Sequence, residues 1–166
     1  MEKAANPVSA SLITHGLAVS ILEKGVLILG ESGSGKTETA LSLLDRGHRL
    51  ISDDAVLLKN KDFQLIASSP DDLYQCLQLT SIGIIDPKQH FTQQSIQSST
   101  CIELAVKLTH KITNTQNISL DFNHIHFLGI RLPLFTIDNR SSHSLALRLE
   151  TLVKQFRLTN ATDHIS

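Results

Sequence analysis

Eight consecutive residues near the start of the chain have the types and spacing of a phosphate-binding loop. They are Gly30-Glu31-Ser32-Gly33-Ser34-Gly35-Lys36-Thr37, which fit the pattern GxxxxGK[ST]. Glycines let successive backbone N–H groups point at phosphate oxygens, and the N-terminus of a following helix adds positive partial charge. Lys36 can reach the β- and γ-phosphates, and the hydroxyl of Thr37 can bind Mg²⁺. These residues predict a site for a purine nucleotide, namely ATP with Mg²⁺.

Two adjacent carboxylates and one histidine are the next candidates for chemistry. Asp53 and Asp54 follow a short apolar run, where a nucleotide enzyme often places a metal-binding aspartate. One of them is expected near Mg²⁺, while the other accepts a proton from an attacking hydroxyl. We place Thr37 and Asp54 at the metal, although the sequence does not distinguish the two aspartates. His15, beside a glycine, has by its own pattern only the character of a residue at a strand end.

Two further groups of polar residues lack the spacing of a site. Asp121, His124 and His126 have the residue types of a metal site but no supporting ligand spacing. The run Asn60-Lys61-Asp62 differs in spacing from the NKxD motif with which GTPases read guanine, so a GTPase switch is not indicated.

Composition indicates a folded domain without a large excess of either charge. Apolar residues make up 41% of the 166 residues, which favours one domain over 1–166. Fifteen basic against sixteen acidic residues give no overall field that would favour nucleic acid or a membrane. Cys76 and Cys101 do not belong to a CxxC pattern, and we expect them to be reduced thiols. With no run of membrane-spanning length and no signal-peptide pattern, we expect a cytoplasmic protein.

The apolar pattern predicts the elements that must position these residues. A strand directly before the loop and a helix directly after it are the arrangement that a phosphate loop requires. The expected order is a strand over 11–21 bent at Gly16, a buried strand over 26–29, a helix over 37–46, and a strand over 48–51 that delivers the aspartates.

In the second half of the chain the apolar residues recur at the shorter spacing of strands, so this half is predicted to contain mainly strands. We expect a hairpin with strands over 55–58 and 63–66, strands over 76–79, 82–85, 102–108 and 127–137, a helix or mobile loop over 86–100, and a long excursion over 109–124. Ser141 or Ser142 is expected to cap a last helix with apolar residues Leu145, Leu149, Leu152 and Val153. The fold class is therefore α/β, a P-loop-containing mixed sheet with flanking helices.

Three stretches together resemble the catalytic domain of HPr kinase/phosphorylase, the bacterial enzyme that phosphorylates a serine of the phosphocarrier HPr. They are Thr14-His15-Gly16, residues 25–41 and residues 46–56, with weaker similarity over 82–86 and 102–108. The resemblance implies an HPr kinase C-terminal-domain-like fold, whose core is similar to that of phosphoenolpyruvate carboxykinase. Because 166 residues leave no room for the family's N-terminal domain, we expect a shortened form.

The resemblance also implies roles for the residues singled out above. Lys36 and Thr37 would hold the nucleotide phosphates and Mg²⁺. His15, Asp53 and Asp54 would line the catalytic centre with Lys36. One aspartate would accept the serine proton in the kinase direction and return it when inorganic phosphate attacks phosphoserine. The implied cofactors are ATP and Mg²⁺, and the implied partners are an HPr-like protein substrate and further copies of the chain in a hexamer.

Two family segments are altered, and this opens alternatives. Where the family has Glu-x-Arg-Gly-Leu-Gly-Ile, this chain has Gln78 to Ile84, so glutamine and Thr80 replace the acid and the arginine. The family's Gly-Arg-Asn segment is not recognisable near Pro133 to Arg140. In the family these segments are associated with dephosphorylation and with the loop that faces the partner protein. We therefore expect the reverse phosphorolysis to be weak or absent, and an acceptor other than HPr stays open. A small-molecule kinase on the same core and an ATP-sensing regulatory protein without catalysis are the alternatives to a protein kinase.

Overall fold

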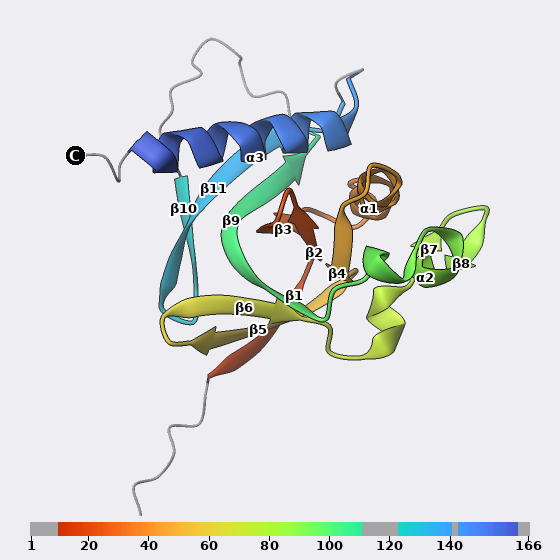
Figure 1. Ribbon diagram of the computed structural model, residues 1–166, viewed down its shortest axis with the longest axis horizontal. Helices are drawn as coiled ribbons and strands as arrows, with labels where there is room; N and C mark the ends of the chain where they lie inside the picture. Colours follow the sequence, from red (N-terminus) through yellow and green to blue (C-terminus); the bar gives the residue numbers. More distant parts are fainter. Residues whose placement is uncertain (1–9, 111–122, 141–142, 163–166) are drawn as a thin grey trace, which may run out of the picture.

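A mixed nine-stranded sheet forms the centre of the molecule and carries two helices on one face. The computed structural model describes residues 10–110, 123–140 and 143–162. Helix α1 (Lys36–Asp45) and helix α3 (Leu145–Thr162) pack against the same face, as Figure 1 shows. Their apolar residues meet those of β2, β3 and β9 in one core, as the helical spacing predicts.

The strand order mixes antiparallel and parallel neighbours. The main path runs β1 (Ser11–His15), β5 (Ala55–Lys61), β6 (Gln64–Ser68), β9 (Ser99–Thr109), β3 (Lys24–Leu29), β2 (Leu17–Ile21) and β4 (Arg49–Ser52). Strand β11 (Ile130–Asp138) joins β9 in parallel, and β10 (Asn123–Phe127) pairs with β11 in antiparallel fashion. Strands β3, β9 and β11 therefore run in one direction and end at one edge of the sheet.

The long strand β9 curls the sheet. Its first residues pair with β6, and its later residues pair with β3 on one side and β11 on the other. In Figure 1 it is the long bent strand between β6 and β3. Where β9 begins to pair with β3, a side chain at Gly25 would collide with the carbonyl oxygen of Cys101, which lies 2.1 Å from an added Cβ. The curl encloses a second apolar core on the face away from the helices.

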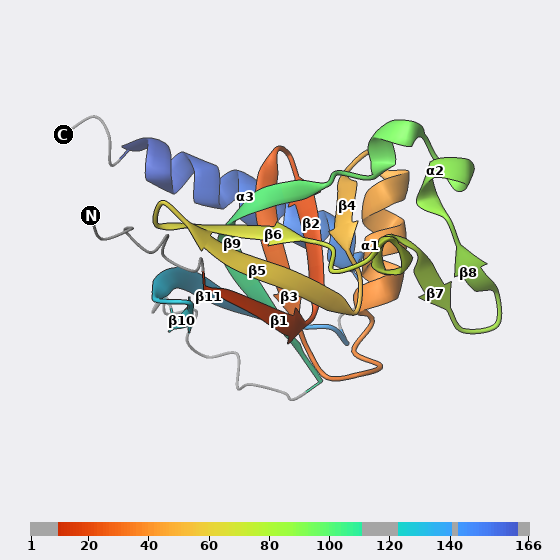
Figure 2. The same cartoon turned by 90° about the horizontal axis from the view of Figure 1, so that it is seen from below.

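A small excursion lies beside α1, away from the main sheet (Figure 2). It contains the 3₁₀ turn η1 (Asp72–Gln75), the hairpin β7 (Leu77–Leu79) and β8 (Gly83–Ile85), helix α2 (Pro87–His90) and the 3₁₀ turn η2 (Gln93–Ser95). The buried faces of Leu77 and Leu79 anchor the hairpin in the helix-side core, whereas Ile82 and Ile84 are exposed.

A buried carboxylate ties α3 to the end of α1. Both oxygens of Glu150 accept hydrogen bonds from Arg46 at 2.6 Å, and Nε2 of His48 lies 2.7 Å from one of them. The pKa of Glu150 falls to about 2, chiefly because Arg46 hydrogen-bonds its charged form. This cluster holds the C-terminal end of the loop's helix in place.

Most of the expected elements are present, and the mixed α/β class is confirmed. Two expected strands are wrong. Residues 11–21 form β1 and β2, which separate at Gly16 and pair with different strands. Residues 127–137 do not form one strand, because the chain turns at Leu128-Gly129 between β10 and β11.

Other boundaries moved by a few residues. The hairpin turn lies at Asp62-Phe63, both with positive φ, because β5 continues to Lys61. The segment 86–100 contains α2 and η2. The expected caps Ser141 and Ser142 and most of 109–124 lie outside the described residues, while Ser144 accepts a hydrogen bond from the Leu147 N–H. No helix in the described part of the chain is long and apolar enough to cross a membrane.

Candidate active site

The phosphate loop lies between the end of β3 and the start of α1. Gly33 and Gly35 have φ values of 80° and 90°, in the left-handed region that glycine adopts without a steric cost. Gly35 is the N-cap of α1, and its carbonyl accepts the hydroxyl of Thr39 at 2.6 Å. The loop therefore ends at a helix N-terminus, whose free N–H groups and dipole favour an anion.

Lys36 is folded back over its own loop. Its Nζ donates to the carbonyls of Gly30 at 2.9 Å and Glu31 at 3.0 Å, and it lies 3.4 Å from the hydroxyl of Ser34. Burial lowers the pKa of Lys36, and the nearby charges of Asp53 and Asp54 oppose that shift. The ammonium group is thus held at the mouth of the loop.

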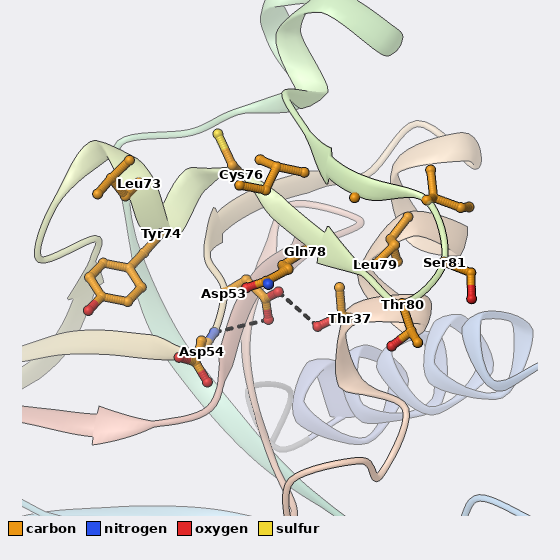
Figure 3. A pocket seen from close by; sticks show the side chains of 13 residues that line it. Thr37, Asp53, Asp54, Leu73, Tyr74, Cys76, Gln78, Leu79, Thr80 and Ser81 are labelled. Atoms are coloured by element: carbon orange, nitrogen blue, oxygen red, sulfur yellow. Dashed lines mark hydrogen bonds between the residues drawn. The ribbon is translucent and has the colours of Figure 1, made fainter.

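Thr37 and Asp53 form a pair across the site. The Thr37 hydroxyl donates to Oδ2 of Asp53 at 2.9 Å, and the backbone N–H of Asp54 donates to Oδ1 at 3.0 Å (Figure 3). Asp53 is only 5% exposed, and this burial raises the pKa of its carboxyl group above the usual value. The carbonyl of Tyr74 in η1 accepts the N–H of Asp53, so the excursion braces the end of β4.

Asp54 points the other way, toward His15. Its carboxylate lies 3.2 Å from Nδ1 of His15, and the two side chains are 71% and 52% exposed. Its φ of 69° places it at the centre of a three-residue turn closed by a hydrogen bond from the Ala55 N–H to the Asp53 carbonyl. The N–H of Gly16 donates to the Asp54 carbonyl, and this hydrogen bond joins the bend after β1 to the bend after β4. Such strained backbone often marks a functional position.

These residues lie where two cavities meet. The first, which we call the loop cavity, has a volume of about 230 Å³ and is lined by His15, Lys36, Thr37, both aspartates and loop residues. The second, the large cavity, has a volume of about 1010 Å³ and extends from Thr37 and the aspartates to η1 and the β7–β8 hairpin. The structure therefore brings together all the predicted site residues: the loop, His15, Lys36, Thr37, Asp53 and Asp54.

The two positions altered relative to the family resemblance lie at the same junction. Gln78 and Thr80 line both cavities, and Figure 3 shows Gln78 next to Asp53. Among the thirteen described residues that line the large cavity there is no Lys, Arg or His. Its charged side chains are two carboxylates, and its outer part carries exposed Leu73, Ile82 and Ile84.

The structure adds one residue that the sequence pattern did not indicate. Asn139, directly after β11, donates from Nδ2 to the carbonyl of Ser34 in the phosphate loop. It is 105 positions away in the chain, so no local pattern could have connected it with the loop. The structure describes only part of the group Asp121, His124 and His126 that the sequence analysis considered. His124 and His126 lie on β10 and Asp121 is outside the described residues, while the described chain contains no group of three metal-ligating side chains.

Comparison with known proteins places this geometry in a family. The sequence model of the HPr Serine kinase C-terminal domain matches residues 6–165. The chain belongs to that family. HPr kinase/phosphorylase of Lachnoclostridium phytofermentans is 38% identical over 146 residues, covering 86% of this chain and 47% of that protein. The protein of the same name from an Exiguobacterium strain is 38% identical over 149 residues, covering 88% and 48%.

A solved structure supports the same placement for the HPr serine kinase fold. The structure of the Hpr(Ser) kinase/phosphatase from Coxiella burnetii superposes with a TM-score of 0.81 at 34% identity, covering 90% of this chain and 99% of that one. The chain spans about half the length of the curated relatives it matches. The matched residues 6–165 include the phosphate loop, the two aspartates and His15.

Proposed function

We propose that this chain transfers the γ-phosphoryl group of ATP to a serine hydroxyl of a protein, HPr or an HPr-like carrier. The observation that carries the proposal is the junction of the loop cavity with the large cavity at Thr37, Asp53 and Asp54. A phosphate site on one side and an open space on the other, with two carboxylates between them, is the arrangement that phosphoryl transfer to a hydroxyl needs.

The loop supplies binding and charge compensation. The backbone N–H groups of the glycine-rich turn and Lys36 would hold the β- and γ-phosphates. Lys36 now bonds to carbonyls of its own loop, so phosphate oxygens would exchange with these acceptors rather than with bulk water. Because its pKa is lowered by burial, an incoming anion would also restore its preference for the charged form.

Thr37 and Asp53 fit a Mg²⁺ ion. Hydroxyl and carboxylate oxygens are ligands that Mg²⁺ prefers, and it commonly takes one or two carboxylates together with substrate phosphates. The sequence pattern assigned Asp54 to the metal, but the Thr37 hydroxyl contacts Asp53 instead. We therefore propose Thr37 and Asp53 as the metal-side pair, where Mg²⁺ would offset phosphate charge.

Asp54 is then the proton acceptor, with His15 as its positioning residue. Asp54 lines both cavities, and its exposed carboxylate can reach a hydroxyl that enters from the large cavity. The serine oxygen forms a bond to the γ-phosphorus as its proton moves to Asp54. The bond from the γ-phosphorus to the β–γ bridging oxygen breaks, and ADP leaves with that electron pair.

The lining of the large cavity favours a protein acceptor over an anionic metabolite. A carboxylated or phosphorylated small molecule would enter beside two carboxylates without a basic side chain among the described lining residues. Leu73, Ile82 and Ile84 are each more than 70% exposed around this space, and an apolar protein surface would cover them. These features support a neutral hydroxyl on a protein segment and argue against the small-molecule kinase.

The same lining supports a one-way reaction. Phosphorolysis needs phosphoserine and inorganic phosphate at the junction, and both are anions that bind best to paired cations. Gln78 and Thr80 offer only neutral groups there. We therefore propose weak or absent phosphorolysis. An ATP-sensing protein without transfer is the second candidate, favoured by these same neutral residues.

The decisive experiment is transfer of labelled γ-phosphate from ATP to HPr or to a protein of a cell extract in the presence of Mg²⁺. We expect a labelled acceptor band with the wild-type chain and none with the double variant Asp53→Asn and Asp54→Asn. Label that survives in the double variant would refute the assigned roles, and ATP binding without an acceptor would favour the regulatory candidate. Phosphorylated HPr with inorganic phosphate tests the reverse direction through pyrophosphate release.

The apolar outer part of the large cavity gives a separate test of the acceptor class. Ile82→Ser and Ile84→Ser together should raise the KM for a protein acceptor roughly tenfold, because two aliphatic contacts with the acceptor are lost. The affinity for ATP should not change. Phe63→Ser is the matched control, because Phe63 is also exposed but lies in the β5–β6 turn. Self-association into a hexamer is a further proposal from family membership, tested by light scattering.

A further inference from the structure

One hydroxyl group at the junction of the loop cavity and the large cavity is left unused by the proposed transfer. Two side chains with a hydroxyl group line both spaces, and they are Thr37 and Thr80. The Thr37 hydroxyl donates to the Asp53 carboxylate at 2.9 Å. The Thr80 hydroxyl is exposed and has no hydrogen-bond partner within the described part of the chain. It is therefore available as a nucleophile.

The tip of the β7–β8 hairpin fixes the position of Thr80. The N–H of Ile82 donates to the carbonyl of Leu79 at 3.3 Å, which closes a four-residue turn with Thr80 as its second residue. Ser81, the third residue of the turn, has a φ of 71°. Leu79 is buried in the same apolar core as residues of α1. Because Thr80 directly follows this anchor, it is not at the end of a free loop.

Thr80 lies on the phosphate side of the hairpin tip. It lines the loop cavity together with Lys36, Thr37 and both aspartates, and Figure 3 shows its side chain beside Thr37. The neighbouring hydroxyl of Ser81 lines the large cavity but not the loop cavity. A hydroxyl that is held in one cavity with the reacting phosphate has a far higher effective concentration than a hydroxyl of a separate molecule.

We propose that the protein phosphorylates its own Thr80. The proposal rests on the proposed function, because it uses the same phosphate loop and the same proton acceptor. The Thr80 Oγ1 forms a bond to the γ-phosphorus of ATP as its proton moves to the Asp54 carboxylate. The bond from the γ-phosphorus to the β–γ bridging oxygen breaks, and ADP leaves with that electron pair. The products are ADP and phosphothreonine at position 80.

A phosphate on Thr80 inhibits further transfer. It adds a charge of about −1.5 to −2 at neutral pH, beside the carboxylates of Asp53 and Asp54. Among the described residues that line the loop cavity, the basic side chains are Lys36 and His15. The phosphothreonine competes with the γ-phosphate of ATP for Lys36, and it repels a second triphosphate. Self-phosphorylation therefore stops at one phosphate per chain and leaves the kinase less active.

Incubation of the full chain with labelled ATP and Mg²⁺, without an acceptor, tests the proposal. Tandem mass spectrometry of proteolytic fragments identifies the modified residue. We expect one phosphate per chain, on Thr80, and an initial rate per chain that stays constant when the protein concentration is raised about tenfold, because the reaction is intramolecular. The phosphorylated chain should bind Mg-ATP about tenfold more weakly than the unmodified chain, because the added charge repels the triphosphate.

Substitutions at the hairpin tip identify the nucleophile. Thr80→Val keeps the branched shape of the side chain but removes the hydroxyl, so its label should be lost while Mg-ATP binding shows that the variant is folded. Thr80→Ser keeps the hydroxyl, and its label should appear on serine 80. Ser81→Ala is the matched control, because it removes the adjacent hydroxyl, which does not line the loop cavity, and its label should remain on Thr80.

A parallel assay with HPr or a cell extract separates this proposal from the proposed function. A wild-type chain that labels an acceptor but not itself would overturn self-phosphorylation and leave the proposed function intact. Label that persists in Thr80→Val, or a rate per chain that rises with protein concentration, would overturn it as well. A wild-type chain that labels neither an acceptor nor itself would refute the proposed function, and self-phosphorylation with it.

Discussion

Replacing Asp53 by asparagine should make the protein more stable at neutral pH while abolishing transfer. The carboxylate is almost fully buried, and burial is the largest cause that raises its pKa, so the folded state disfavours its charge. Asparagine is nearly isosteric. Its Oδ1 can accept the Asp54 N–H and its amide can donate to the Thr37 hydroxyl, so both hydrogen bonds of the site have a replacement.

The sign of the pH dependence follows from the raised pKa. A carboxyl whose pKa is higher in the folded state binds more protons when folded, so its contribution to stability is greatest below the unfolded pKa and is lost as pH rises through the folded pKa. Wild type and Asp53→Asn should therefore be equally stable below the unfolded pKa, diverge as pH rises from the unfolded pKa to the raised folded pKa, and differ by a constant amount above it. Relief of an active-site strain of this kind is typically worth about 1 kcal/mol, which corresponds to roughly 2–4 °C in Tm for a chain of this size.

Thermal unfolding at a series of pH values, without nucleotide, measures this difference. The same samples assayed for transfer should show a loss of about a thousandfold or more, because an interaction with the transferring group is removed. Thr136→Ser, at an exposed position of β11, serves as a control for handling and refolding. An asparagine variant that is less stable than wild type at pH 7 would refute the view that burial of the Asp53 carboxylate is a cost to the fold.

Two further substitutions test the supports of the site. Glu150→Ala should destabilise the fold by about 3 kcal/mol, the lower end for a broken buried pair because Arg46 remains partly exposed, and denaturant unfolding measures it. Since the pKa of Glu150 is lowered to about 2, its contribution should be present above pH 4.5 and lost toward pH 2, so the variant should approach wild type there. His15→Gln should lower kcat about tenfold or more with little change in ATP affinity, if His15 orients Asp54. An equal loss of ATP affinity would assign His15 to binding instead.

The phosphate loop could be predicted from sequence because its requirements are local. Glycine at two left-handed positions, lysine one residue later and an apolar strand before them are all contained in about a dozen consecutive residues. The aspartates were also found by their position after a strand. Which of them faces Thr37 depends on the turn at Asp54 and on the carbonyl of Tyr74, and neither leaves a sequence pattern.

The strand errors have a common physical cause. Apolar periodicity reports that a segment is extended and buried, but it does not report where the chain changes partners. At Gly16 the backbone passes from β1, which pairs with β5, to β2, which pairs with β3, without a polar turn. At Leu128-Gly129 a two-residue turn interrupts an apolar run. The break at Gly16 follows from the pairing of β1 with the distant strand β5, whereas the break at Leu128-Gly129 is the turn of the local β10–β11 hairpin. Asn139 could not be predicted because its partner Ser34 lies 105 positions away in the chain.

Under the proposed function, the binding of nucleotide and the choice of acceptor depend on different parts of the chain. Lys36, Thr37 and Asp53 are fixed by β3, β4 and α1, which share the buried core of the sheet. The walls that face an acceptor come from η1 and the β7–β8 hairpin, whose side chains at Leu73, Ile82 and Ile84 are exposed. Substitutions in such a hairpin change the cavity at little cost to folding, because they remove few buried contacts. Under the proposed function, the neutral residues at positions 78 and 80 would therefore alter the direction and the acceptor of the reaction while the phosphate site stays intact.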